Sequence, residues 1–170
     1  MSQLILRPFT EEEYHQFFKA YQSDPLMDPH PFRYNREQIS RSYVYNYGGY
    51  QENYAHFGIF LDEVPVGSFQ LKRMDRTEKK CEFGIILQND TVKNKGIGTE
   101  AIRTGIRIAK EQFGIQTMIG ETMGRNGRMI RVFEKLGFDL AETITGAYEL
   151  PDGSKEDRLI YIRQLTGERT

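Results

Sequence analysis

Residues 92–99 read Val92-Lys93-Asn94-Lys95-Gly96-Ile97-Gly98-Thr99 and lie between an apolar run and the start of an amphipathic helix. The helix is predicted because apolar residues recur at helical spacing, at Ile102, Ile106, Ala109 and Phe113. The first turn of a helix has unpaired backbone N–H groups and a dipole that attracts an anion. Gly96 and Gly98 expose those groups, and Lys93 and Lys95 add positive charge. The stretch predicts a phosphate or pyrophosphate site; the alternative is a tight strand-to-helix connection whose lysines bind nothing.

Upstream of this stretch, three β-rich runs predict three sequential strands, at residues 55–61, 64–73 and 81–87. Side chains alternate between the two faces of a strand, so Glu82 points away from the face that carries Phe83. Cys81 shares the face of Phe83, and we interpret it as a small core residue and not as a nucleophile.

The N-terminal part is predicted to hold a short strand over residues 4–7 and two helices. The first helix begins at Thr10, with acids in its first turn, and ends before Pro25. The second begins at Asn35 and ends by Gly48, after an irregular, proline-rich loop.

The C-terminal part continues the alternation of strands and helices. Residues 117–120 predict a short strand, and Asn126 predicts the N-cap of a helix that Gly137 closes. A strand from Phe138 follows, and then a hairpin that pairs residues 147–150 with 158–165.

Composition limits the class of protein. The chain has 170 residues, enough for one α+β domain over residues 1–170, and its 23 Lys and Arg nearly cancel 24 Asp and Glu. We therefore expect no nucleic-acid partner. No apolar run approaches the roughly 18 residues of a membrane span, and no signal peptide is expected. Cys81 is the one cysteine, which excludes an internal disulfide and a multi-cysteine zinc site and favours a reducing cytoplasm. No metal site is expected.

A second motif lies downstream. Residues 126–138 read N-G-R-M-I-R-V-F-E-K-L-G-F. This segment is similar to N-x-x-x-[IS]-R-[LV]-[YFL]-E-K-x-G-F of the GNAT N-acetyltransferases, and Lys93 to Gly98 resembles their loop [QR]-x-x-G-x-[GA], with Lys at its first position. The segments FEKLGF and LRPFTEEE are most similar to those of the ribosomal-protein (RimJ/RimL-like) branch. The resemblance covers nearly the whole chain and implies a mixed, mostly antiparallel central sheet flanked by helices.

The resemblance also implies that acetyl-CoA is the cosubstrate. Backbone groups of Ile85, Ile86 and Leu87 would contact its pantetheine arm. The pyrophosphate would lie against the glycine-rich loop, at Lys93, Asn94, Lys95, Gly96, Ile97, Gly98 and Thr99. Asn126 would contact the cofactor arm and Arg131 a CoA phosphate. From the residues alone, Asn126 is first an N-cap and Arg131 a solvated surface side chain.

Acyl transfer to an amine needs a base for the amine proton and a donor that polarises the thioester carbonyl. Glu82, on a central strand beside the expected cofactor groove, is the first base candidate, and Glu121, at the end of the next strand, is the second. Many GNAT relatives protonate the thiolate with a Tyr where this chain has Phe133. Either another hydroxyl such as Tyr148 serves, or the thiolate leaves unassisted, because a thiol is far more acidic than an alcohol. A backbone N–H near Ile86 would polarise the carbonyl.

The acceptor site is expected in the loop before the second helix, at His30, Phe32, Arg33 and Tyr34, since that loop flanks the acceptor groove in similar enzymes. The alternative is a packed aromatic loop with a surface histidine. A protein N-terminus, a polyamine, an aminoglycoside or another small amine all remain candidate acceptors. Exposed strand edges near the C-terminal hairpin are compatible with a homodimer.

Two other functions compete. A non-catalytic CoA- or nucleotide-binding sensor is suggested by Phe133. A dinucleotide-binding oxidoreductase is suggested by Gly96, Gly98 and Ala101, which fit G-x-G-x-x-[GA], with Glu121 as the ribose carboxylate. The oxidoreductase ranks lower, because residues 88–95 separate the glycines from the strand and the preceding strands have no crossover helices.

Overall fold

The computed structural model describes residues 3–26, 28, 30–49 and 51–165 and shows a seven-stranded sheet in the order β1-β2-β3-β4-β5-β7-β6. Neighbouring strands are antiparallel except β4 and β5, which are parallel. The strands are β1 (Leu4–Arg7), β2 (Ala55–Leu61), β3 (Val64–Asp75), β4 (Lys80–Leu87), β5 (Thr117–Met123), β6 (Asp139–Glu149) and β7 (Lys155–Gln164). The α-helices are α1 (Glu11–Lys19), α2 (Arg36–Tyr47), α3 (Ile97–Phe113) and α4 (Gly127–Lys135). The expected α+β fold is confirmed.

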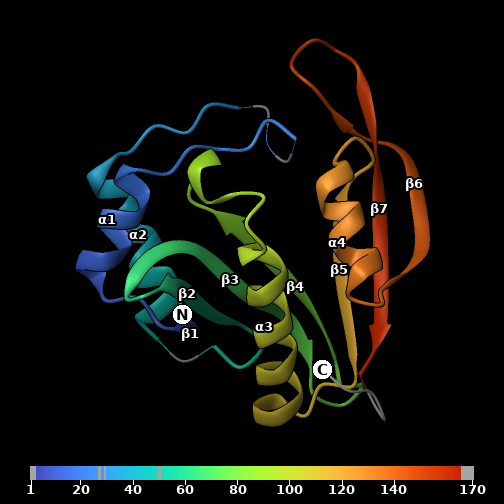
Figure 1. Cartoon of the computed structure of the whole chain (residues 1–170), viewed down its shortest axis with the longest axis horizontal. Helices are drawn as coiled ribbons and strands as arrows, with labels where there is room; N and C mark the ends of the chain where they lie inside the picture. The colour runs from blue at the N-terminus through green and yellow to red at the C-terminus, as the bar shows by residue number, and fades with distance from the viewer. Residues whose placement is uncertain (1–2, 27, 29, 50, 166–170) are drawn as a thin grey trace.

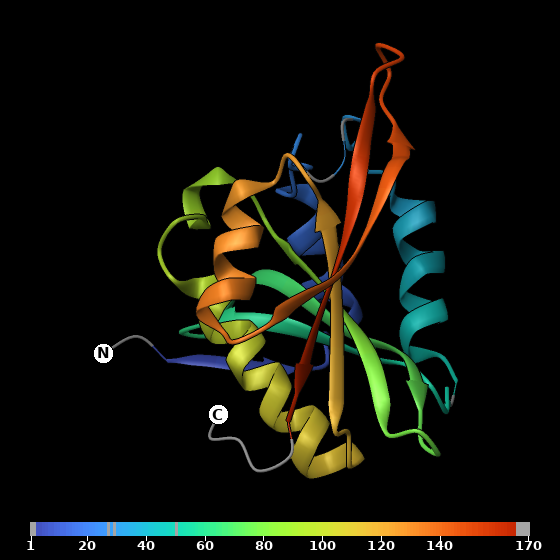
Figure 2. The same cartoon turned by 90° about the vertical axis from the view of Figure 1, so that its right-hand side faces the viewer.

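Helices cover both faces of the sheet, α1 and α2 on one side and α3 and α4 on the other (Figure 2). A large core beneath α3 and α4 holds Phe69, Phe83 and Phe133, and a smaller aromatic core beneath α1 and α2 holds Phe17 and Phe60. Helix α3 packs so closely on the sheet that a Cβ on Gly105 would lie 2.2 Å from the Phe69 ring. A glycine is therefore required there.

Strands β4 and β5 pair over only three residues and then separate. Lys80, Cys81 and Glu82 oppose Thr117, Met118 and Ile119, although both strands continue beyond these pairs. Figure 1 shows the two strands meeting near the bottom of the view and parting above it. The rings of Phe83 and Phe133 pack over Gly120, the first β5 residue after the last pair, where a Cβ would lie 2.5 Å from the Phe133 ring. These rings fill the space beneath the point of separation.

Local signals place the helix starts correctly. Thr10 and Glu13 form a reciprocal capping box, and the side chains of Asn35 and Asn126 cap α2 and α4. Cys81 is buried, as expected, and burial raises the pKa of its thiol to about 12.

Strand and helix lengths differ from expectation in three places. Helix α1 ends at Lys19, and residues 21–24 run on without helix, tied to the sheet by the N–H of Gln22, which donates to the carbonyl of Gln88 at 2.8 Å. Strand β5 continues to Met123, because β7 pairs with its whole length. The strand from Phe138 and the hairpin arm at 147–150 form one strand, β6, whose register irregularities keep it paired with β7.

His56 is buried in the smaller core beside Tyr47. Its Nδ1 lies 2.6 Å from the Tyr47 hydroxyl, and the residue is 6% exposed. Burial disfavours the charged imidazolium and lowers the pKa of His56 from 6.5 to about 4. The unfolded chain therefore binds a proton at His56 at a higher pH than the folded chain does. The stabilisation is fully present above pH 6.5 and is lost as the pH falls towards 4.

We predict that the free energy of unfolding, measured with urea, falls by about 2 kcal/mol between pH 7 and pH 5 through this one group. His56→Gln should remove most of that dependence, whereas His30→Gln, at an exposed histidine, should keep it. Glu13, whose pKa the Arg7 guanidinium lowers to about 2, contributes only below pH 4.5. An unchanged pH dependence in His56→Gln would contradict this account.

Candidate active site

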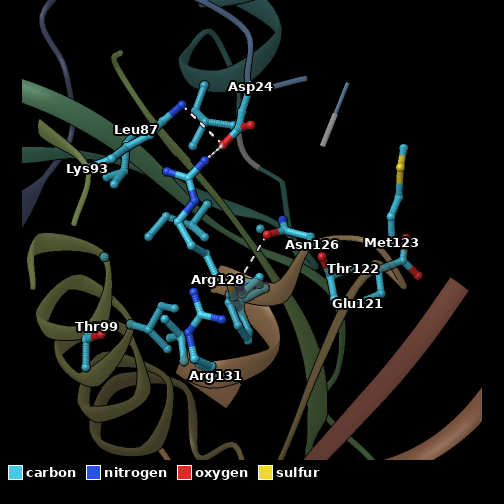
Figure 3. A pocket seen from close by; sticks show the side chains of 18 of the residues that line it. Asp24, Leu87, Lys93, Thr99, Glu121, Thr122, Met123, Asn126, Arg128 and Arg131 are labelled. Atoms are coloured by element: carbon cyan, nitrogen blue, oxygen red, sulfur yellow. Dashed lines mark hydrogen bonds and ion pairs between the residues drawn. The ribbon is translucent and has the colours of Figure 1, made fainter. Parts of the chain in front are cut away.

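A cavity of about 590 Å³ lies in the opening between β4 and β5. Its walls come from β3, β4, the loop after β4, α3, β5, α4 and the β6 arm of the hairpin, together with Tyr21 and Asp24 after α1. Figure 3 shows Asp24 and side chains from β4, the loop after β4, α3, β5 and α4 around it. The separation of the strands thus forms a site to which segments distant in sequence contribute.

The N-terminus of α3 lies at one side of the cavity. Gly96 is its N-cap with φ +78°, and no side chain caps this helix end. A Cβ on Gly96 would meet nothing within 4 Å, and one on Gly98 would only touch Leu87 at 3.8 Å. The backbone here is open to a ligand, as an anion site requires.

The predicted cofactor loop divides between the cavity and its surroundings. Lys93, Asn94, Gly96, Gly98 and Thr99 line the cavity. The Ile97 side chain is buried in the core and the Lys95 side chain is exposed, and neither lines the cavity. Ile97 and Lys95 can therefore serve a ligand there only through their backbone groups.

The Lys93 ammonium is engaged by carboxylates. Its Nζ lies 3.2 Å from Asp24 Oδ2 and 3.2 Å from Asp90 Oδ1, and its side chain is 9% exposed. Arg128 also reaches Asp24, at 3.6 Å (Figure 3). Our sequence reasoning missed Asp24 and Arg128. Helical spacing offered a signal for Arg128, since it lies three and seven residues before Arg131 and Lys135, whereas no local pattern marks Asp24.

Helix α4 presents a basic stripe to the cavity, formed by Arg128, Arg131 and Lys135. Together with Lys72 and Lys93, the cations that line the cavity outnumber the acids, which among the described residues are Asp24 and Glu121. Such an excess of positive charge suits a polyanionic ligand.

The wall on the β4 side contains Ile85, Ile86 and Leu87, the residues that the family resemblance assigns to the pantetheine arm. Asn126 lines the cavity and also caps α4, since its Oδ1 accepts from the N–H of Met129 at 3.2 Å. It is 4% exposed. The two roles considered for Asn126 are therefore geometrically compatible.

The two carboxylates that are candidates for the base lie in different environments. Glu121 lines the cavity, with Oε2 3.9 Å from Arg158 Nε and its side chain 37% exposed. Glu82 forms an ion pair with Arg73 and does not line the cavity. The reason is that β4 and β5 are still paired at Glu82 and separate only beyond it.

Phe133 is buried in the core. It is 1% exposed and stacks on Tyr161 with ring centroids 4.4 Å apart. Tyr148 lines the cavity from β6, and the Arg158 guanidinium lies 5.3 Å from its ring centroid. Tyr148 is thus a hydroxyl within the site, as is the buried Thr122.

The residues expected at the acceptor site lie apart from this cavity. The His30 side chain is exposed and hydrogen-bonds Asp28, and Arg33 does not line the cavity either. Phe32 packs against Tyr21, and the Tyr34 hydroxyl lies 2.7 Å from His15 Nδ1. These four residues therefore lie outside the cavity, to which the segment after α1 contributes Tyr21 and Asp24.

Comparison with known proteins identifies the family. Residues 3–139 match the family described as acetyltransferase (GNAT) domain. The chain belongs to the GNAT acetyltransferases. It is therefore an N-acetyltransferase that uses acetyl-CoA, which confirms the resemblance seen in the sequence.

Solved structures share the fold at low sequence identity. The RimL ribosomal L7/L12 alpha-N-protein acetyltransferase in complex with coenzyme A has a TM-score of 0.80 and 17% identity, covering 97% of this chain and 96% of that one. The spermidine N-acetyltransferase from Vibrio cholerae in complex with CoA and spermine has a TM-score of 0.80 and 13% identity, covering 95% of each chain. A chimera of that enzyme, SpeG, with hSSAT gives 0.83 and 14%, also covering 95% of each. No curated protein sequence matches.

The described residues contain no group of three or more His, Cys, Asp or Glu side chains arranged to hold a metal ion. None of their helices is long and apolar enough to cross a membrane.

We predict that Gly98→Trp weakens acetyl-CoA binding at least about tenfold, because the indole fills the space in front of the α3 N-terminus. Gly49→Trp, at a position where a Cβ meets nothing within 4 Å and which does not line the cavity, is the matched control and should bind normally. Isothermal titration calorimetry measures both. Equal affinity in the two variants would show that the cofactor binds elsewhere.

Proposed function

We propose that the chain transfers the acetyl group of acetyl-CoA to a primary amine by direct attack in a ternary complex. One observation supports this above the others: the cavity has walls on both faces of the sheet. On β4, Phe83, Ile85 and Leu87 face α3, whereas Gly84 and Ile86 face the side of α1 and α2. Two substrates can therefore approach one point from opposite faces.

The cofactor would lie on the face of α3 and α4. The N–H groups at Gly96, Gly98 and Thr99 would bind the pyrophosphate, with Arg131 providing positive charge. The pantetheine arm would run along β4 at residues 85–87, next to Asn126. In this arrangement the thioester carbonyl accepts from a backbone N–H near Ile86.

Glu121 is the base candidate that the geometry favours. On β5, Gly120 faces the core below α4, so Glu121 points to the opposite face, from which the amine would enter. The amine nitrogen attacks the carbonyl carbon, a C–N bond forms and the C–S bond breaks. Glu121 accepts the amine proton directly or through water, and the thiolate takes a proton from solvent or from Tyr148.

The acceptor class follows from the charges on the amine side. RimL acts on a ribosomal protein and the Vibrio cholerae enzyme on spermidine. Here Glu121 lies beside Arg158, and Lys72 lines the same cavity. The extra positive charges of a polyamine add little binding free energy where the Glu121 carboxylate is already neutralised by nearby cations. We therefore propose a protein N-terminus or a small monoamine as the acceptor.

We also propose that the protein acts in the cytoplasm. Its buried Cys81 forms no disulfide, which is consistent with a reducing compartment. The edge strand β6, with Leu140 52% exposed, offers a surface for a homodimer.

We predict that Glu121→Gln lowers kcat by about 100-fold or more while the Kd for acetyl-CoA changes little, because only proton transfer is lost. Glu82→Gln, outside the cavity, should keep kcat within about threefold. Steady-state kinetics with a thiol-release assay measures both. A normal kcat in Glu121→Gln would remove it as the base.

A panel of acceptors tests the substrate class. At equal concentration we expect a peptide with a free N-terminus and a small monoamine to be acetylated faster than spermidine. A reversed order would overturn the acceptor assignment, and Lys72→Glu should move the preference towards spermidine. Acetyl-CoA binding without turnover of any amine would favour the alternative of a non-catalytic sensor, which Phe133 suggests.

A further inference from the structure

Asp24 forms the centre of a charged cluster in the wall of the cavity. Its Oδ2 lies 3.2 Å from Lys93 Nζ and 3.6 Å from Arg128 Nη2, and its Oδ1 accepts from the N–H of Leu26 at 2.9 Å. The Asp24 side chain is 19% exposed. Figure 3 shows Lys93 and Arg128 approaching it from different segments, the loop after β4 and the start of α4.

Asp24, Lys93 and Arg128 all line the cavity, which is also lined by Gly96, Gly98 and Thr99 at the uncapped end of α3. Two cations near a helix N-terminus form an anion site. In this structure the anion at those cations is the carboxylate of Asp24. A diphosphate that enters must therefore share the two cations with Asp24 or displace it, and two anions on the same cations repel each other.

Displacement requires little rearrangement of the cations. Lys93 keeps a second carboxylate, since Asp90 Oδ1 also lies 3.2 Å from its Nζ. The contact of Arg128 with Asp24 is long, at 3.6 Å, and is readily exchanged for a phosphate oxygen. Asp24 lies outside the regular elements, between α1 and α2, where its side chain can turn without breaking a helix or strand.

We propose that Asp24 is a resident competitor for the diphosphate of the cofactor, which displaces it from Lys93 and Arg128. This inference rests on the proposed cofactor position. It makes Asp24 a determinant of cofactor affinity, and it links cofactor binding to the segment between α1 and α2. When the Asp24 side chain turns away from the cations, it also breaks its hydrogen bond with Leu26, whose N–H donates to Asp24 Oδ1 in this structure.

Calorimetry with three probes tests the competition: coenzyme A, inorganic pyrophosphate, and pantetheine, which lacks the diphosphate. For Asp24→Asn we expect about tenfold tighter binding of coenzyme A and pyrophosphate and less than twofold change for pantetheine. Asp90→Asn is the matched control, because it removes a carboxylate at the same distance from Lys93 that is exposed and lies outside the cavity. It should change each affinity less than threefold.

Weaker binding of coenzyme A by Asp24→Asn, or an effect equal to that of Asp90→Asn, would overturn the inference. Failure of the wild-type protein to bind coenzyme A would instead overturn the proposed function. Amide hydrogen exchange of the wild-type protein provides a second measurement that needs no variant. We expect coenzyme A to accelerate exchange at Leu26, and protection of that amide would contradict the displacement of Asp24.

Discussion

The separation of β4 from β5 is the constraint on which the rest of the structure depends. Three residue pairs join the strands, and beyond Glu82 and Ile119 each strand bonds to its outer neighbour alone, β3 or β7. An exposed strand edge leaves backbone N–H and C=O groups without partners, which is costly in a core and useful beside a ligand. Phe83 and Phe133, packed over Gly120, fill the space beneath the separation. The cavity above it is lined by segments that range along the chain from Tyr21 to Tyr148.

The two cores give the two faces of this opening different chemistry. The core below α3 and α4 fixes a helix N-terminus and a basic stripe on one face, where a polyanion is stabilised. The alternation of side chains along β5 places Glu121 on the other face, the side of α1 and α2. The alternation also explains why adjacent residues differ in role: Thr122 is buried against the core, whereas Glu121 is half-exposed in the site.

Local patterns in the sequence predicted most of the fold and the glycine-rich loop that lines the cavity. Helix spacing, caps such as Thr10 and Asn126, and the glycine pair at residues 96 and 98 depend on neighbours along the chain, so they are visible without a structure. The place of Glu82 on its strand was predicted, but its exclusion from the cavity was not, because that depends on where two strands that are distant in sequence stop pairing. The ion pair of Asp24 with Lys93 joins residues that only the tertiary fold brings together, and Asp24 itself carries no sequence signal.

A crystal structure of the protein with bound coenzyme A tests the central claim most directly. We expect the pantetheine arm to hydrogen-bond the free edge of β4 at residues 85–87 while β4 and β5 stay separated. The diphosphate should contact the N–H groups at Gly96 to Thr99. A cofactor bound away from that edge, or strands paired beyond Glu82 and Ile119, would contradict the account.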